Sequence, residues 1–267
     1  GGDVMNGNAV QAIARKDLKV VIRNKTVSIP LIVMPVVILV GLPVATALMP
    51  KIGDMGDMQS LMGPLQALLA GYDEAQGPVV YLLAFMVVPF YLLMSVTVSI
   101  AGASDSFAGE KERKTLEALL YTPTTDGELL LGKLLSAWLP SLGIAWGGFL
   151  LYIVTANLAA WPVMGRLWFP TTMWLVLALW VAPAVTGLGV VAMVLISSRA
   201  RTFQAAYSLG AMVIVPILLL GVLPLSGVMA FSAWVLALLG LLFWAIDAVL
   251  LWLGWHSFRR TKLALEM

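Results

Sequence analysis

The hydrophobic pattern of the chain consists of six long apolar runs separated by shorter stretches that are rich in polar and charged residues. A helix needs about 20 consecutive apolar residues to cross the hydrocarbon core of a bilayer. The pattern therefore predicts six transmembrane helices, at residues 28–49, 79–103, 134–156, 173–196, 203–223 and 230–255. We expect residues 1–267 to form one all-α polytopic membrane domain.

The composition agrees with this pattern and narrows the chemistry. Hydrophobic residues make up 61% of the chain and charged residues only 11%, against about 25% charged residues in soluble domains. The chain has no cysteine and a single histidine, His256, which excludes a disulfide framework, a thiolate nucleophile and a multi-histidine metal site. The predicted spans hold no pair of carboxylates for acid–base work, so an intramembrane enzyme is poorly supported.

The positions of the basic residues predict the orientation. All but two of the 16 lysines and arginines lie before the first span, after the last span, or in the connections between spans two and three and between spans four and five. The two exceptions, Lys51 and Arg166, lie on the opposite side. Because cytoplasmic flanks are enriched in lysine and arginine, both termini are predicted to be cytoplasmic. The tryptophans near the span ends, Trp161, Trp168, Trp174, Trp252 and Trp255, suit a membrane-interface belt or packing between helices.

Residues 8–26 form the first predicted cytoplasmic element. Val10 and Ile13 begin an apolar stripe at helical spacing, and Arg15, Lys19 and Arg23 form a basic stripe opposite it. Such a helix suits the membrane interface, with its cations at anionic lipid headgroups. The alternative is a helix that packs on the rest of the protein.

The second predicted cytoplasmic element is a helix over residues 108–121, between spans two and three. Its first half is charged and its second half is apolar, with Thr122 and Pro123 ending it. Thr125 and Glu128 then form the pattern of a capping box, which opens the next helix. A helix divided in this way suits docking onto a soluble partner, and it equally suits a solvated loop helix without a partner.

A near match to a phosphate-binding loop lies just beyond this element. Gly127, Gly132 and Lys133 fit the spacing G-x-x-x-x-G-K-[ST], but Leu134 stands where the hydroxyl that holds Mg²⁺ is needed. The residues between the glycines are those of an apolar helix rather than a loop. We therefore expect no bound cofactor and no ATP hydrolysis in this chain, and nothing in the sequence indicates a nucleic-acid partner.

The string "FAGEKERKTLEALLYTPTTDGELLLGKLLSAWL" resembles the cytoplasmic segment of ABC-2-type permeases, the membrane subunits of a large class of ABC transporters. Those proteins typically carry a Gly-Glu-x-Glu-Arg-x-Thr-Leu-Glu run, a Thr-Pro turn and a Leu-Gly-Lys start of the third span. The matching positions here are Gly109, Glu110, Glu112, Arg113, Thr115, Leu116, Glu117, Thr122, Pro123, Leu131, Gly132 and Lys133.

The resemblance implies a half-transporter of the plasma (inner) membrane, with export favoured over import. Two such permeases would pair, as a homodimer or a heterodimer, and each would sit on a cytoplasmic ABC ATPase subunit that holds ATP and Mg²⁺. Residues 108–121 would be the coupling helix. By position, the residues implied in ATPase coupling are Glu110, Glu112, Arg113, Lys114, Leu116 and Glu117. Many members of the family have glycine at the position of Lys114. Nothing in the spans selects a substrate class.

Three further features lie in or near the spans. Asp247 is the one ionisable residue well inside a span, and it is a candidate proton or cation site or a hinge contact. The alternatives are a carboxyl satisfied by neighbouring Ser, Thr or Trp donors and, for the whole protein, an ion-coupled secondary transporter or channel that uses Asp247. Ser95, Ser99 and Ala103 form a small-residue face for packing within one subunit or between two. The connection at 223–230 contains Pro224 and Gly227 and is a candidate re-entrant segment.

Overall fold

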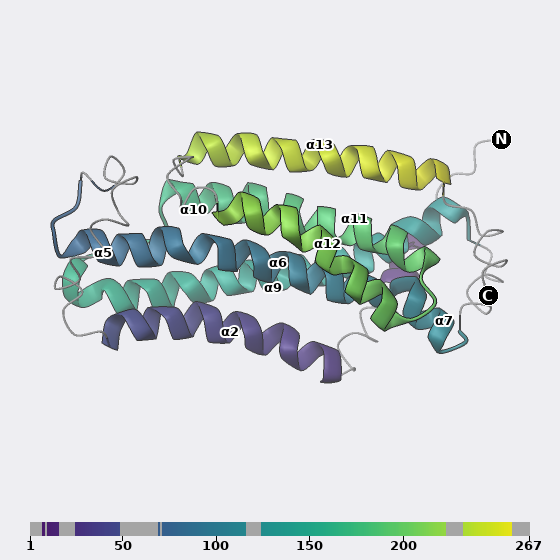
Figure 1. The fold of residues 1–267 in the computed structure, drawn as a ribbon, viewed down its shortest axis with the longest axis horizontal. Coiled ribbons are helices and arrows are strands. Elements are labelled where there is room, and N and C mark those ends of the chain that lie inside the picture. Colours follow the sequence, from purple (N-terminus) through teal and green to yellow (C-terminus); the bar gives the residue numbers. More distant parts are fainter. Residues whose placement is uncertain are drawn as a thin grey trace.

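The computed structural model describes residues 7–8, 10–15, 25–48, 69, 71–115, 124–222 and 232–257, and these residues form a helical bundle (Figure 1). Its elements in chain order are α2 (Lys25–Leu48), α5 (Gln76–Val80), η3 (Tyr81–Met86), α6 (Val87–Ser104), η4 (Asp105–Gly109), α7 (Glu110–Glu112), α9 (Asp126–Met164), α10 (Thr172–Val176), η5 (Leu177–Val181), α11 (Ala182–Arg199), α12 (Phe203–Val222) and α13 (Ala233–Ser257). The η segments are π-helical turns within longer helices.

Four of the predicted spans fall on continuous helices that are long and apolar enough to cross a membrane: Gln76–Glu112, Asp126–Met164, Thr172–Arg199 and Ala233–His256. The predicted spans at 28–49 and 203–223 coincide with α2 and α12, whose described apolar stretches are shorter, Ile32–Leu48 and Phe203–Ile217. In the described ranges all regular secondary structure is thus helical, and four of the helices are candidate spans. The count of six spans stays a prediction.

The second and fourth predicted spans form the centre of the bundle. In their most apolar windows, 78% of the residues of Gln76–Glu112 and 72% of those of Thr172–Arg199 are buried inside the protein. Close approach of α6 and α11 depends on small residues: a Cβ on Gly189 would lie 3.0 Å from the Cβ of Ser99. Ser95, Ser99 and Ala103 are fully buried, so their small-residue face serves packing within one subunit.

Two prolines interrupt these central helices, and the structure compensates for both in the same way. A proline has no N–H to donate, and a membrane helix tolerates it where neighbouring groups satisfy the freed carbonyl. The carbonyl of Ala84, five residues before Pro89, accepts from Trp174 Nε1 at 2.8 Å. The carbonyl of Ala178, five residues before Pro183, accepts from Trp146 Nε1 at 2.9 Å. Five residues is the spacing of a π-helical turn, which is why each proline follows a π-helical segment.

The tryptophans near the predicted span ends differ in burial. Trp174 is fully buried among aromatic rings of other helices, stacked on Phe149 at 6.2 Å and tilted against Tyr91 at 5.4 Å. Trp161, Trp252 and Trp255 are exposed on the described surface, and their place in a membrane-interface belt stays a prediction.

α13 is the most peripheral of the four candidate spans. Only 22% of the residues in its most apolar window are buried, and large side chains such as Trp234, Leu238 and Leu241 are exposed. In a membrane these side chains face lipid or another subunit. α13 runs along one side of the bundle (Figure 1) and packs against α10, η5 and α11.

The N-terminal helix is described only over residues 7–8 and 10–15. Val10 and Ile13 are buried, and a Cβ on Gly132 would lie 2.8 Å from Cγ2 of Ile13. This part of the predicted 8–26 helix therefore packs on α9. Residues 16–24, which hold Lys19 and Arg23, lie outside the described residues, and the interfacial role stays a prediction.

Candidate functional site

The second-span helix does not end where its apolar run ends. It continues through the π-helical segment η4 into α7 and stops at Glu112. The prediction of a separate helix over 108–121 is therefore wrong at its start, because residues 108–112 extend the span. Lys114 then takes a left-handed conformation with φ 58°, and Thr115 N donates to Glu110 O at 2.9 Å, which closes the helix. Residues 116–123, including Leu116, Glu117 and the Thr122-Pro123 stop, lie outside the described residues.

We call the region around η4 and α7 the motif end of the bundle; it comprises Asp105–Thr115, the first turns of α9, the last turn of α11 and the first turn of α12 (Figure 1, near the label α7). Ser197 of α11 joins η4 to this region. Its Oγ accepts from the backbone N–H groups of Phe107 and Ala108, both at 2.9 Å, and it donates to Ser104 O at 3.2 Å. One buried serine thus satisfies the backbone that the π-helical turn displaces.

A buried ion pair forms the centre of the motif end. Lys133 Nζ lies 2.9 Å from Glu110 Oε1, and the two residues are 0% and 4% exposed. The ammonium also donates to Ser106 O at 2.8 Å and lies 5.5 Å from the centre of the Phe107 ring. Removing one partner of such a pair leaves an uncompensated buried charge, which costs about 3–5 kcal/mol.

This arrangement corrects the predicted placement of Glu110. The resemblance implied that Glu110 faces a partner ATPase, but its carboxylate points into the protein and holds Lys133 of α9. A run of alternating charges such as Glu110–Lys114 resembles a solvated surface in sequence. Its first member is buried here because the second-span helix extends past the apolar run and lies against α9.

The next residues along the motif are exposed. Glu112, Arg113 and Lys114 lie at the surface, and their contact with an ATPase stays a prediction. Glu112 Oε2 accepts from Phe203 N at 3.0 Å, so a carboxylate sits at the N-terminus of α12, where the helix dipole favours it. Lys111 Nζ donates to Ser198 O of α11 at 2.7 Å.

Asp105 is a partner of Arg113 that the sequence pattern did not reveal. Arg113 forms two hydrogen bonds to it, Nη1 to Oδ1 at 2.9 Å and Nη2 to Oδ2 at 3.1 Å. A Cβ on Gly109 would clash with the Asp105 carboxylate, so a side chain at this position would displace the carboxylate from Arg113. The signal was present as an acid eight residues before an arginine with a glycine in between, but it becomes readable only once the helix is known to be continuous.

The capping box that was predicted at the start of the third span is confirmed. Glu128 N donates to Thr125 Oγ1 at 3.2 Å, and Thr125 N donates to Glu128 Oε2 at 2.8 Å. Gly127, Gly132 and Lys133 lie in α9 rather than in a phosphate-binding loop. Trp255 of α13 covers this turn, because a Cβ on Gly127 would lie 2.6 Å from its ring.

Asp247 lies far from the motif end, on the inner face of α13. It is 2% exposed, and neither carboxyl oxygen has a hydrogen-bond partner among the described residues. The alternative of a carboxyl satisfied by neighbouring donors is therefore not what the described structure contains. A Cβ on Gly187 of α11 would lie 2.8 Å from Asp247 Oδ2, so the carboxyl fills the space of a missing side chain.

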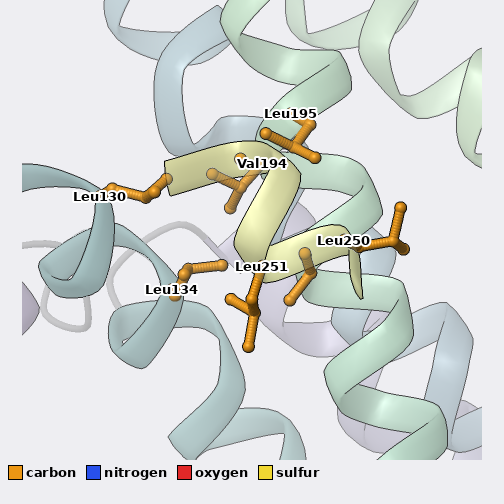
Figure 2. Close-up of a pocket in the computed structure, with 8 residues that line it drawn as sticks. Leu130, Leu134, Val194, Leu195, Leu250 and Leu251 are labelled. Atoms are coloured by element: carbon orange, nitrogen blue, oxygen red, sulfur yellow. The ribbon is translucent and has the colours of Figure 1, made fainter. Parts of the chain in front are cut away.

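A small apolar pocket lies further along the same helix. Leu250, Leu251 and Gly254 of α13 face Leu130 and Leu134 of α9, and Val191, Val194 and Leu195 of α11 complete it (Figure 2). Its lining carries no charged side chain. Within the described ranges, no group of three or more His, Cys, Asp or Glu residues is placed to hold a metal ion.

Comparison with known proteins places the chain in a family. The family described as "ABC-2 family transporter protein" matches residues 11–236, which is most of the chain. The chain is similar to the ABC transporter permease protein NatB of Bacillus subtilis (strain 168), with 34% identity over 93 residues. That match covers 35% of this chain and 24% of the relative, so it spans about a quarter of the relative's length. The chain belongs to the ABC-2 family of transporter proteins.

Proposed function

We propose that the chain is the permease subunit of an ATP-driven exporter and that its motif end is cytoplasmic and docks a separate ABC ATPase. Family membership supports an integral membrane permease subunit of an ABC transporter. The lysines and arginines are concentrated on one side of the predicted spans, which supports a cytoplasmic location for the motif end. A second permease, identical or different, completes the proposed complex, and ATP and Mg²⁺ are held by the ATPase.

The observation that carries the proposal is the way in which the exposed motif residues are fastened to the bundle. Glu112, Arg113 and Lys114 form an exposed tip. The residues around this tip are tied to three other helices, through Glu110 to α9, through Lys111 to α11 and through Glu112 to α12. A force applied at the tip would reach all three helices, because each is joined to the tip region by a polar contact and the contact to α9 is a buried ion pair.

The division of labour within the motif follows from these contacts. Glu110 anchors the tip from inside, and Asp105 holds Arg113 in position at its base. Contact with the ATPase falls to the exposed Glu112, Arg113 and Lys114, together with Leu116 and Glu117, whose placement lies outside the described residues.

The experiment is co-purification of the partner ATPase with the tagged full chain from membranes, comparing wild type with the double variant Glu112→Lys/Arg113→Glu. We expect the double variant to insert normally and to lose most of the ATPase. Arg166→Glu, an exposed charge reversal beyond the far end of α9, is the matched control and should retain the ATPase. The proposal fails if the double variant keeps the ATPase and its ATP hydrolysis at wild-type levels.

A further inference from the structure

The seam between α11 and α13 contains an acid, Asp247, that has no hydrogen-bond partner within the described part of the chain. Asp247 is 2% exposed, and its two oxygens have no hydrogen-bond partner among the described residues. Its surroundings are apolar: Gly187 of α11 opposite Oδ2, with Trp138 of α9 close to the same glycine. The indole N–H of Trp138 is already used, since it donates to Pro183 O at 3.2 Å.

The charged groups on the elements that pack against α13 are all remote from this acid. α10 and η5 contain none, and α11 contains only Arg199. Arg199 is exposed in the last turn of α11, about 18 Å along the helix from Gly187 at 1.5 Å per residue. On α9, which supplies Trp138, Lys133 is bound to Glu110 and Asp126 and Glu128 lie in the first turn. On α13 itself the other titratable group is His256, in the last turn.

These surroundings favour the neutral, protonated form of the Asp247 carboxyl. An ionised carboxylate without donors, counter-charge or water is strongly unfavourable in an apolar site, and such a group neutralises instead. The neutral acid fits the space beside Gly187. An ionised Asp247 requires hydrogen-bond donors or water at its carboxylate, and a wider α11–α13 seam would admit water there.

α13 is placed to make that movement. It is the least buried of the four candidate spans, with 22% of its window inside the protein, and it contacts the bundle along one side (Figure 1). Toward its C-terminal end the seam contains the apolar pocket between Leu250, Leu251 and Leu195 (Figure 2). The seam is therefore lined by apolar side chains near the acid, on a helix that contacts the bundle through its inner face.

We propose that Asp247 is a proton-binding site that closes the α11–α13 seam when protonated and opens it when the proton leaves. The site is independent of the ATPase contact at the motif end, and its ligand is a proton rather than a transported solute. Ionisation would bring water into the seam, and protonation would expel it.

The test uses the absence of cysteine from the chain. A Cβ on Gly254 would lie 3.2 Å from Leu195 Cδ2, so Leu195→Cys together with Gly254→Cys places two thiols across the seam. The double-cysteine chain, reconstituted in lipid nanodiscs, is treated with a short bifunctional thiol reagent from about pH 6 to about pH 9. The same pair combined with Asp247→Asn is the matched control. Because Asn carries no titrating proton, the ratio of the two crosslinking yields removes the pH dependence of the thiols.

We expect this ratio to fall severalfold as the pH rises. In parallel, dicyclohexylcarbodiimide, which reacts with protonated carboxyl groups inside membranes, should label Asp247 at low pH and progressively less at high pH. Glu110 is the internal comparison, since its carboxylate is buried with Lys133 and should stay unlabelled. A ratio that is flat across the pH range overturns the proposal. A ratio that changes with sodium or potassium concentration at fixed pH also overturns it, in favour of a metal-cation site.

Discussion

Two buried carboxylates in this protein have opposite surroundings. Glu110 at the motif end is 4% exposed and Asp247 in the α11–α13 seam is 2% exposed, so both are withdrawn from solvent to the same degree. Glu110 has Lys133 at 2.9 Å, whereas Asp247 has no hydrogen-bond partner among the described residues. Burial alone therefore does not determine what an acid does in a membrane protein.

The difference lies in what each acid can do when its surroundings move. A paired carboxylate keeps its charge, and separating it from its partner is costly, so it fixes the geometry of the helices that carry the pair. An unpaired carboxyl exists in two forms with different needs for water, so it can respond to a change in its surroundings. We infer that the ion pair makes the motif end move as a rigid unit. The α11–α13 seam, by contrast, would open or close with the ionisation of Asp247.

The largest effect is expected at the ion pair. Lys133→Met should lower the free energy of unfolding by about 3–5 kcal/mol, because it leaves the Glu110 carboxylate buried without a counter-charge. Adding Glu110→Gln should recover most of that loss, since an apolar or neutral replacement of both partners is often close to neutral. Titration of the full chain with sodium dodecyl sulfate from mixed micelles measures both. A Lys133→Met chain as stable as wild type would contradict the ion-pair assignment.

The next effect tests the space beside Asp247. In Gly187→Ala the new Cβ would lie 2.8 Å from Oδ2, so the carboxyl or the helix must shift, at a cost of about 1–3 kcal/mol in unfolding free energy. Gly143→Ala is the matched control, since a Cβ there meets no atom within 4 Å. The smaller side chain of Asp247→Ala should relieve the clash in the double variant. Equal stability of the Gly187→Ala and Gly143→Ala chains would show that the acid does not occupy this space.

The sequence predicted the elements of this bundle better than the contacts between them. Apolar runs locate helices because each span must satisfy its own backbone in lipid, and the Thr125–Glu128 capping box is a local pattern of four residues. The burial of Glu110 could not be read in the same way, because it depends on Lys133, 23 positions later, and on a span that continues past its apolar run. Ser197 gave no signal, since a serine at the end of an apolar helix is unremarkable in sequence.

Asp247 was only partly predictable from the sequence. An acid within an apolar run is conspicuous, so the sequence identified the residue, but its empty polar surroundings required the positions of α9 and α11. At Lys114 the structure explains a feature of the family pattern that the sequence alone left unexplained. The glycine that many family members carry there had no explanation in the sequence, and the left-handed φ of 58° supplies one.

A smaller effect is expected when each of the two buried acids is replaced by its amide. In the proposed neutral form of Asp247, Asp247→Asn exchanges an uncharged acid for an uncharged amide of the same shape, so the free energy of unfolding at neutral pH should change by less than about 1 kcal/mol. Glu110→Gln makes the same exchange but leaves Lys133 charged and buried, so it should cost about 3 kcal/mol or more. The detergent titration measures both variants side by side. Equal losses would mean that Asp247 is also ionised and paired, and would remove the contrast between the two regions.

The smallest effect concerns the residue that ends the helix at the tip. Lys114→Gly should stabilise the fold by about 0.5 kcal/mol, because glycine adopts the left-handed conformation without the steric cost that a lysine pays, less the extra backbone entropy that glycine loses on folding. The same substitution removes an exposed cation from the proposed ATPase surface. If Lys114 serves only as a helix end, the Lys114→Gly chain should be slightly more stable and should co-purify with the ATPase as wild type does. A more stable chain that loses the ATPase assigns Lys114 to the contact surface, and a less stable chain contradicts the left-handed turn itself.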